Sequence, residues 1–365
     1  MADKAQHPEI STLQLTAYAA PSIPLTMLLA PLVAYLPAFY AVDMKFGLGA
    51  IGVAFLLGRL IDGFADPLIG LLSDHTKVRW GRRAPWLVVG TPILMLATYI
   101  LCMPGPGATL ATLTVTLVLF YLASTIVQIP YYAWGAEISS GYMGRNRVSG
   151  FREAGFVIGM VIAVGLPGLL LGSGAPPLRQ VLVIYTRAIL LLLPLTVALA
   201  VMSVREYPLV ATARVSFRDM LKAIIGNKPL LGFLAGYLLL YTAVSVFDAT
   251  MVFFFTFVLK QPNFLHFILI QYLCSLLFMP VAVRFGNAFG KHVSMCLFAA
   301  GYSSALLAYA LIPAGAPVLT VMIVMVKGAS IPFYRVMPTS MIGDLADYNE
   351  LKSGASLTGV YMSLL

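Results

Sequence analysis

The chain has 365 residues, of which 60% are hydrophobic and only 10% are charged, and its formal net charge is +9. Soluble domains carry about 25% charged residues, so this composition excludes a soluble fold and indicates a membrane protein. The basic residues are scattered over separate short loops, which argues against a surface that binds nucleic acid.

Apolar runs long enough to cross a bilayer recur along the chain and predict ten complete membrane spans. We place them near residues 20–42, 48–72, 84–103, 108–134, 151–172, 181–203, 229–258, 264–285, 293–313 and 316–341. Residues 353–365 resemble the beginning of another span, so we expect a truncated sequence that ends within its eleventh span. The predicted fold class is an all-α membrane protein.

Lysine and arginine concentrate in the loops that follow even-numbered spans. These loops contain Lys77, Arg79, Arg82, Arg83, Arg145, Arg147, Arg152, Arg205, Arg214, Arg218, Lys222, Lys228, Arg284, Lys291 and Lys352. The loops after odd-numbered spans contain only Lys45, Arg179 and Lys260. Because cytoplasmic loops are enriched in basic residues, we expect a cytoplasmic N-terminus. The spans predict a multi-pass protein, and the location we expect is a bacterial inner membrane.

The second predicted span contains three charged side chains inside an apolar run, Arg59, Asp62 and Asp66. At about 100° per residue, the two aspartates lie about 40° apart on one helix face, within about 60° of Arg59. A charge at mid-membrane costs roughly 2.5–3.5 kcal/mol, so such groups usually face a cavity and mark an ion or substrate path. This stripe is the first candidate binding site.

Other charges offer two readings each. Four charged residues lie in or next to the loop after the second span and indicate a cytoplasmic gate or a topology element. They are Asp74, Arg79, Arg82 and Arg83. Three intramembrane charges lie further along the chain, at Asp248, Lys327 and Arg335. They could pair with one another across the second half for structural reasons, or they could bind substrate.

The chain divides into two halves. The longest cytoplasmic connection includes Ser216–Asp219, a capping-box-like helix start, followed by apolar residues at helical spacing. It is either an amphipathic helix on the inner surface or a solvated linker. The basic loop 79–83 recurs six spans later at 284–291, which predicts a parallel repeat of six helices, the architecture of major facilitator transporters. We expect an N-terminal bundle at 1–204, a loop at 205–228 and an incomplete C-terminal bundle at 229–365.

At these residues the chain resembles the glycoside-pentoside-hexuronide:cation symporters, the melibiose permease-like family of the major facilitator superfamily. The motif that carries the resemblance consists of Arg59, Asp62, Asp66, Pro67, Gly70, Asp74, Arg79, Trp80, Gly81, Arg82, Pro85 and Trp86. Further agreement lies in Ile129–Tyr132, Glu137, Tyr142, Arg145, Arg152 and the run from Asp347 to Gly354. The resemblance implies alternating-access symport of a sugar, glycoside or uronide by a monomer in the lipid bilayer.

The resemblance also implies roles for single residues. Asp62, Asp66 and Thr125 would bind the coupling cation, H⁺ or Na⁺, and Gln128 replaces a family carboxylate there. Tyr132 would be a ring platform for the sugar and Arg152 a guanidinium beside it. The helix I aspartate of the family has no counterpart in residues 21–40. No cofactor besides the coupling ion, and no enzymatic activity, is expected.

Two alternatives remain. A lysolipid or other lipophilic solute would suit the apolar first span, as in a eukaryotic branch of the same family. A membrane prenyltransferase would use spaced aspartates to hold Mg²⁺ and a diphosphate, and Asp62 with Asp66, or Asp344 with Asp347, invite that comparison. The first pair lies well inside its span, and the spacing typical of such enzymes is missing.

Overall fold

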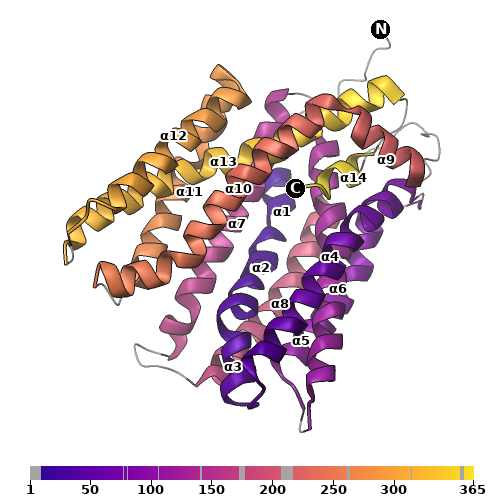
Figure 1. Cartoon of the computed structure of the whole chain (residues 1–365). Coiled ribbons are helices and arrows are strands. Elements are labelled where there is room, and N and C mark those ends of the chain that lie inside the picture. The colour runs from indigo at the N-terminus through magenta and orange to yellow at the C-terminus, as the bar shows by residue number, and fades with distance from the viewer. Residues whose placement is uncertain are drawn as a thin grey trace.

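The structure is a computed structural model that describes residues 10–76, 78–79, 81–105, 107–139, 142–171, 177–206, 217–260, 264–313, 315–353 and 357–365. The regular elements within these residues are all helices (Figure 1). They are α1 (Thr12–Ala19), α2 (Ser22–Met27), η1 (Pro31–Tyr35), α3 (Leu36–Val42), α4 (Leu48–His75), α5 (Ala84–Cys102), α6 (Leu110–Ile138), α7 (Tyr142–Leu171), α8 (Leu178–Ser203), α9 (Phe217–Gly226), α10 (Lys228–Phe253), η2 (Phe254–Val258), α11 (Phe264–Phe289), α12 (Lys291–Tyr309), α13 (Pro317–Ser353) and α14 (Thr358–Met362).

Within the described residues, nine helical segments are long and apolar enough to cross a membrane. The first of them, Thr12–Val42, consists of α1, α2, η1 and α3 in succession. Prolines at positions 21, 31 and 37 lie where these pieces begin, because proline lacks the N–H that a continuous helix needs. Each predicted complete span coincides with a helix or a run of helices, and the all-α fold class is confirmed.

The predicted beginning of the fifth span was wrong. The span was placed at residue 151, but α7 begins at Tyr142, so Arg145, Arg147 and Arg152 lie on the helix and not in a loop. Arg145 and Arg152 are buried, and both contact carboxylates. Their pairing lowers the cost of placing charge on a helix that packs against others. Likewise, α13 continues past residue 341 to Ser353.

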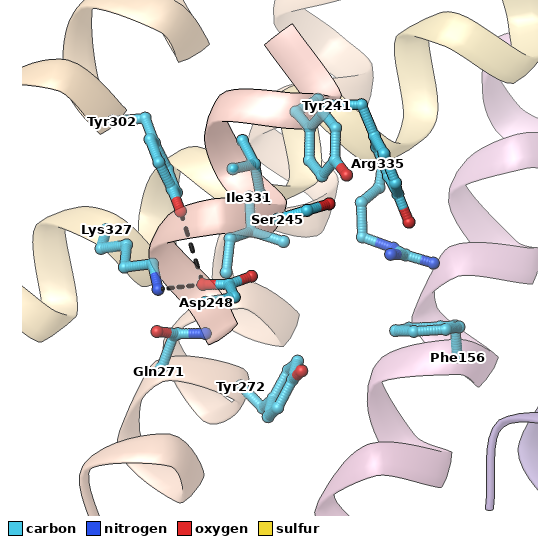
Figure 2. A pocket seen from close by; sticks show the side chains of 12 residues that line it. Phe156, Tyr241, Ser245, Asp248, Gln271, Tyr272, Tyr302, Lys327, Ile331 and Arg335 are labelled. Atoms are coloured by element: carbon cyan, nitrogen blue, oxygen red, sulfur yellow. Dashed lines mark hydrogen bonds and ion pairs between the residues drawn. The ribbon is translucent and has the colours of Figure 1, made fainter. Parts of the chain in front are cut away.

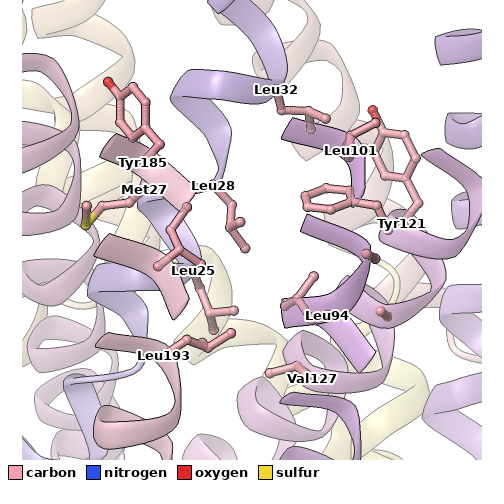
Figure 3. Close-up of a cluster of buried hydrophobic side chains, with 14 of the residues drawn as sticks. Leu25, Met27, Leu28, Leu32, Leu94, Leu101, Tyr121, Val127, Tyr185 and Leu193 are labelled. Carbon is pink, nitrogen blue, oxygen red and sulfur yellow. The ribbon is translucent and has the colours of Figure 1, made fainter. Parts of the chain in front are cut away.

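The apolar side chains gather in several clusters. The largest draws only on residues 15–204 and includes Leu28, Leu94 and Leu193 from three different segments (Figure 3). Two smaller clusters draw on α10 to α13. Two more join α6 or α7 to the later helices, one of them through Val157 and Met279. The molecule therefore has two groups of helices that meet along apolar seams.

The connection between the two groups contains the predicted helix. It forms α9, in which Met220 is buried and Leu221 and Ile225 are exposed. The capping residue Ser216 lies outside the described residues. The helix is confirmed, and its position on a membrane surface stays a prediction.

The backbones of the two groups touch where α4 meets α14. A Cβ atom added to Gly70 would lie 2.7 Å from the carbonyl oxygen of Gly359, and one added to Gly359 would lie 2.6 Å from that of Gly70. Both atoms belong to backbone, which cannot rotate away. Glycine at both positions lets the two helices touch.

We predict that Gly70→Ala separates α4 from α14 and destabilises the protein by about 1–3 kcal/mol, the typical cost of overpacking. The matched control is Gly63→Ala on the same helix, where an added Cβ meets nothing within 4 Å. The measurement is the midpoint of thermal unfolding of the purified protein. Equal midpoints for the two variants would contradict the prediction.

Candidate functional site

Two carboxylates of α4 and one hydroxyl of α6 converge between these neighbouring helices. The Thr125 oxygen lies 2.6 Å from Asp62 Oδ1 and 2.9 Å from Asp66 Oδ1, and it can donate its proton to only one of them at a time. Thr125 is buried and both aspartates are partly buried. The helical period places the aspartates on one face, and the packing of α4 on α6 supplies the third oxygen.

The two aspartates differ in their partners. Arg59 Nη1 lies 3.5 Å from Asp62 Oδ2, but the Arg59 side chain is 58% exposed, so this pair contributes little. Within the described residues, Asp66 has no salt bridge to any basic side chain, and its hydrogen-bond partner is Thr125. A partly buried carboxylate without a protein cation can hold a proton or a hard cation such as Na⁺, which prefers several oxygen ligands.

Gln128 lies apart from these three oxygens. Its amide oxygen accepts a hydrogen bond from the Tyr132 hydroxyl at 3.4 Å, one helical turn away, and the described contacts do not join it to Asp62 or Asp66. The structure therefore brings together three of the four residues expected at the cation site.

Tyr132 and Arg152 do come together, as expected for the solute site. The Arg152 guanidinium lies over the Tyr132 ring, with Cζ 4.5 Å from the ring centre. Arg152 is buried and pairs with Glu153 at 2.8 Å. In this conformation the guanidinium itself covers the face of the ring.

Glu153 was missed in the sequence. It accepts from Arg152 on one oxygen and from Arg335 Nε on the other, at 2.7 Å, and so links α7 to α13. An acidic residue next to Arg152 inside an apolar helix was the available signal. For Arg335, the reading in which it pairs within the second half was wrong, because its carboxylate partner lies on α7.

A cavity of about 110 Å³ lies beside this link and is lined by residues of α7 and of α10 to α13 (Figure 2). Asp248 and Lys327 face each other at 2.8 Å on its wall, as one of the two sequence readings expected. The Lys327 side chain is 1% exposed, whereas that of Asp248 is 52% exposed. Aromatic side chains cover much of the remaining wall, namely Phe156, Tyr241, Tyr272, Tyr302 and Tyr334.

Three of the four expected gate residues, Asp74, Arg82 and Arg83, belong to a charge cluster at the C-terminal end of α4. Arg83 is fully buried, and its Nη2 lies 2.5 Å from both Asp74 Oδ1 and Glu137 Oε1. Arg82 forms a second ion pair with Glu137. Burial by itself would lower the pKa of Arg83, but the carboxylates of Glu137 and Asp74 raise it above its ordinary value. Arg79 is exposed and lies outside the cluster.

Asp74 also connects the cluster to α14. Its two carboxylate oxygens accept from the backbone N–H groups of Gly359 at 2.9 Å and Val360 at 3.2 Å. A bond to Arg83 and two bonds to another helix make Asp74 a joint between three segments, and buried charge-assisted bonds of this kind are the strong ones.

A second cluster crosses the seam between α7 and α13. Arg145 donates to Asp344 at 2.9 Å and to Asp347 at 2.6 Å, and the buried Lys291 of α12 also pairs with Asp344. The sequence analysis placed Asp347 in the family motif and considered Asp344 with Asp347 as diphosphate ligands of a prenyltransferase. It did not predict that both carboxylates pair with Arg145.

The chain is similar in sequence to known symporters. The inner membrane symporter YicJ of Escherichia coli (strain K12) is 27% identical over 350 residues, which are 89% of this chain and 72% of that protein. The sodium-dependent lysophosphatidylcholine symporter 1 of Xenopus tropicalis is 24% identical over 362 residues, 88% of this chain and 67% of that protein. The chain therefore spans about two thirds to three quarters of the length of these relatives.

Solved structures share the fold. That of the proton:xylose symporter XylE, bound to 6-bromo-6-deoxy-D-glucose, superposes with a TM-score of 0.64 at 10% identity, covering 96% of this chain and 84% of that one. The model of the MFS/sugar transport protein family matches residues 17–365. The chain is thus an integral, multi-pass membrane transporter and not an enzyme, and it belongs to the MFS/sugar transport protein family of the major facilitator superfamily.

Proposed function

We propose that the chain is a melibiose permease-like symporter that couples H⁺ or Na⁺ to the uptake of a sugar, glycoside or uronide. The observation that carries this proposal is the convergence of Asp62, Asp66 and Thr125, with no basic partner for Asp66 in the described part of the chain. A lysolipid is the second candidate, since a lysophosphatidylcholine symporter is among the relatives and the first span is apolar.

The proposed mechanism is alternating access between bundles 1–204 and 229–365, joined by the loop 205–228. The bundles would rock about a central solute site formed by Tyr132, Arg152, Asp248 and Lys327. Asp74, Arg82 and Arg83, together with the cluster around Arg145, would hold the cytoplasmic end closed in one state and separate in the other. Arg79 would act only as a topology signal.

Ion binding would drive the cycle through Asp66. A carboxylate that lacks a protein cation repels a neighbouring carboxylate until a proton or Na⁺ arrives, and the three oxygens would then close around that ion. Coupling follows if the filled and empty sites favour different arrangements of α4, because a ligand shifts a conformational equilibrium only through its differential affinity.

We expect Asp62→Asn and Asp66→Asn each to abolish accumulation against a gradient, because an amide keeps the size of the carboxylate and loses its charge. The test is uptake into proteoliposomes, under imposed Na⁺ or H⁺ gradients, of a radiolabelled panel of glycosides, uronates and lysophosphatidylcholine. Asp43→Asn, at an exposed position after α3, is the matched control. Accumulation at wild-type level in both variants would refute the proposed coupling site.

A further prediction concerns the gate. Arg145→Ala removes the two ion pairs between α7 and α13 at this end and leaves the hydrogen bond from Ser340 to Asn146, and we expect the bundles to separate there. Spin labels at Val78→Cys and Leu351→Cys, both exposed positions, report the separation by their distance distribution after Cys296→Ser removes the exposed native thiol.

The control for the gate is Arg147→Ala. The guanidinium of Arg147 donates a hydrogen bond to Thr12, which lies in the same half of the chain. We expect a longer mean distance in Arg145→Ala only. The same distribution in wild type and Arg145→Ala would show that this cluster does not hold the gate.

A further inference from the structure

Among the described residues that line the cavity, Arg335 is the one with a guanidinium, and only one edge of this group is engaged. Its Nε donates to Glu153 at 2.7 Å, and its Cζ lies 3.4 Å from the centre of the Phe156 ring (Figure 2). The carboxylate and the ring hold the plane of the guanidinium in place. A guanidinium fixed in this way loses little conformational entropy when it binds a further partner.

Arg335 lines the cavity, and two of its donors are not engaged in the described part of the chain. Within the described residues, no hydrogen bond uses Nη1 or Nη2, and the side chain is 25% exposed although the helix is packed on several sides. These two nitrogens form the fork that matches two oxygens of a carboxylate or a phosphate.

The other cation of the cavity is already neutralised. Lys327 lies eight residues before Arg335 on α13, about 12 Å along the helix axis, and its ammonium donates to Asp248. Figure 2 shows the two cations on opposite sides of the cavity. Arg335 shares Glu153, its one carboxylate partner among the residues that the structure describes, with Arg152.

The charges around the cavity therefore do not balance. Among the described residues, the three cations Arg152, Lys327 and Arg335 are linked to two anions, Glu153 and Asp248, which leaves one positive charge in excess. An unbalanced charge in an apolar setting is costly unless an opposite charge joins it.

We propose that this cavity binds an oxyanion group of the solute, a carboxylate or a phosphate, through two parallel hydrogen bonds from Nη1 and Nη2 of Arg335. This assignment rests on the proposed transport function and narrows the solute to an acidic one. The body of the solute lies against the rings of Tyr241, Tyr272 and Phe156, which suit a sugar face or an acyl chain alike.

The experiment compares probes that differ only in the acidic group. D-glucuronate and D-glucose 6-phosphate are measured against D-glucose, and oleoyl lysophosphatidate against monoolein, by microscale thermophoresis with the purified full chain in nanodiscs. We expect at least one acidic probe to bind about tenfold or more tightly than its neutral partner, the effect of one charge-assisted bidentate contact. Which pair responds separates a carboxylate from a phosphate and a sugar from a lipid.

The variant arm uses Arg335→Lys, which keeps the charge and loses the fork. We expect it to reduce the ratio of the acidic to the neutral affinity at least threefold, and its thermal unfolding midpoint reports whether the variant is folded. Arg187→Lys, at an exposed position on α8, is the matched control and should behave as wild type.

Two results would overturn the assignment. The first is a wild type that binds acidic and neutral partners with equal affinity, or that shows no saturable binding of any acidic probe. This result depends on no variant. The other is an unchanged acidic preference in Arg335→Lys. Oxyanion binding without ion-coupled uptake would refute the proposed function and leave the oxyanion site standing. Ion-coupled uptake of a neutral sugar alone would support the proposed function and refute the oxyanion site.

Discussion

A charged side chain among packed membrane helices is stable only beside an opposite charge, and the described part of the chain is organised by this requirement. Arg83, Arg152, Lys291 and Lys327 are all buried, and each contacts a carboxylate. Several partners lie on the other group of helices, as in the pairs of Glu153 with Arg335 and Arg145 with Asp344. The two groups cannot separate at these points unless the paired residues exchange partners. The same bonds therefore stabilise this conformation and must break when the conformation changes.

Asp66 departs from this rule, and the departure is informative. Its described partner is a threonine hydroxyl shared with Asp62, and no basic side chain pairs with it in the described segments. A site that leaves a negative charge uncompensated can be completed by an ion from solution, just as a site with surplus positive charge around Arg335 can be completed by an anion. In our account, charged side chains that lack a full complement of opposite charge bind ligands. Charged side chains that are fully paired hold the helices together.

Much of this arrangement follows from the sequence because it depends on local periodicity. The positions of Asp62 and Asp66 on one face follow from the helical repeat, and the spans follow from hydropathy. The partners do not, because they are set by packing between distant segments: Thr125 entered through a family resemblance, and Glu153 was missed. Hydropathy also placed Arg145 in a loop, because a hydropathy window counts each charge against a membrane span. The structure shows that two aspartates about 200 residues later neutralise this arginine, and a local window does not contain them.

The central claim is that the oxygens of Asp62, Asp66 and Thr125 bind the ion that drives transport. It is tested most directly by counting ions and solute together in proteoliposomes, with ²²Na⁺ as tracer and a pH-sensitive dye inside the vesicles. Our account predicts that either Na⁺ or H⁺ enters with the solute in a fixed ratio, and that Thr125→Val, which removes only the shared hydroxyl, weakens the dependence of uptake on that ion. Solute uptake accompanied by neither ion, or unaltered ion dependence in Thr125→Val, would contradict it.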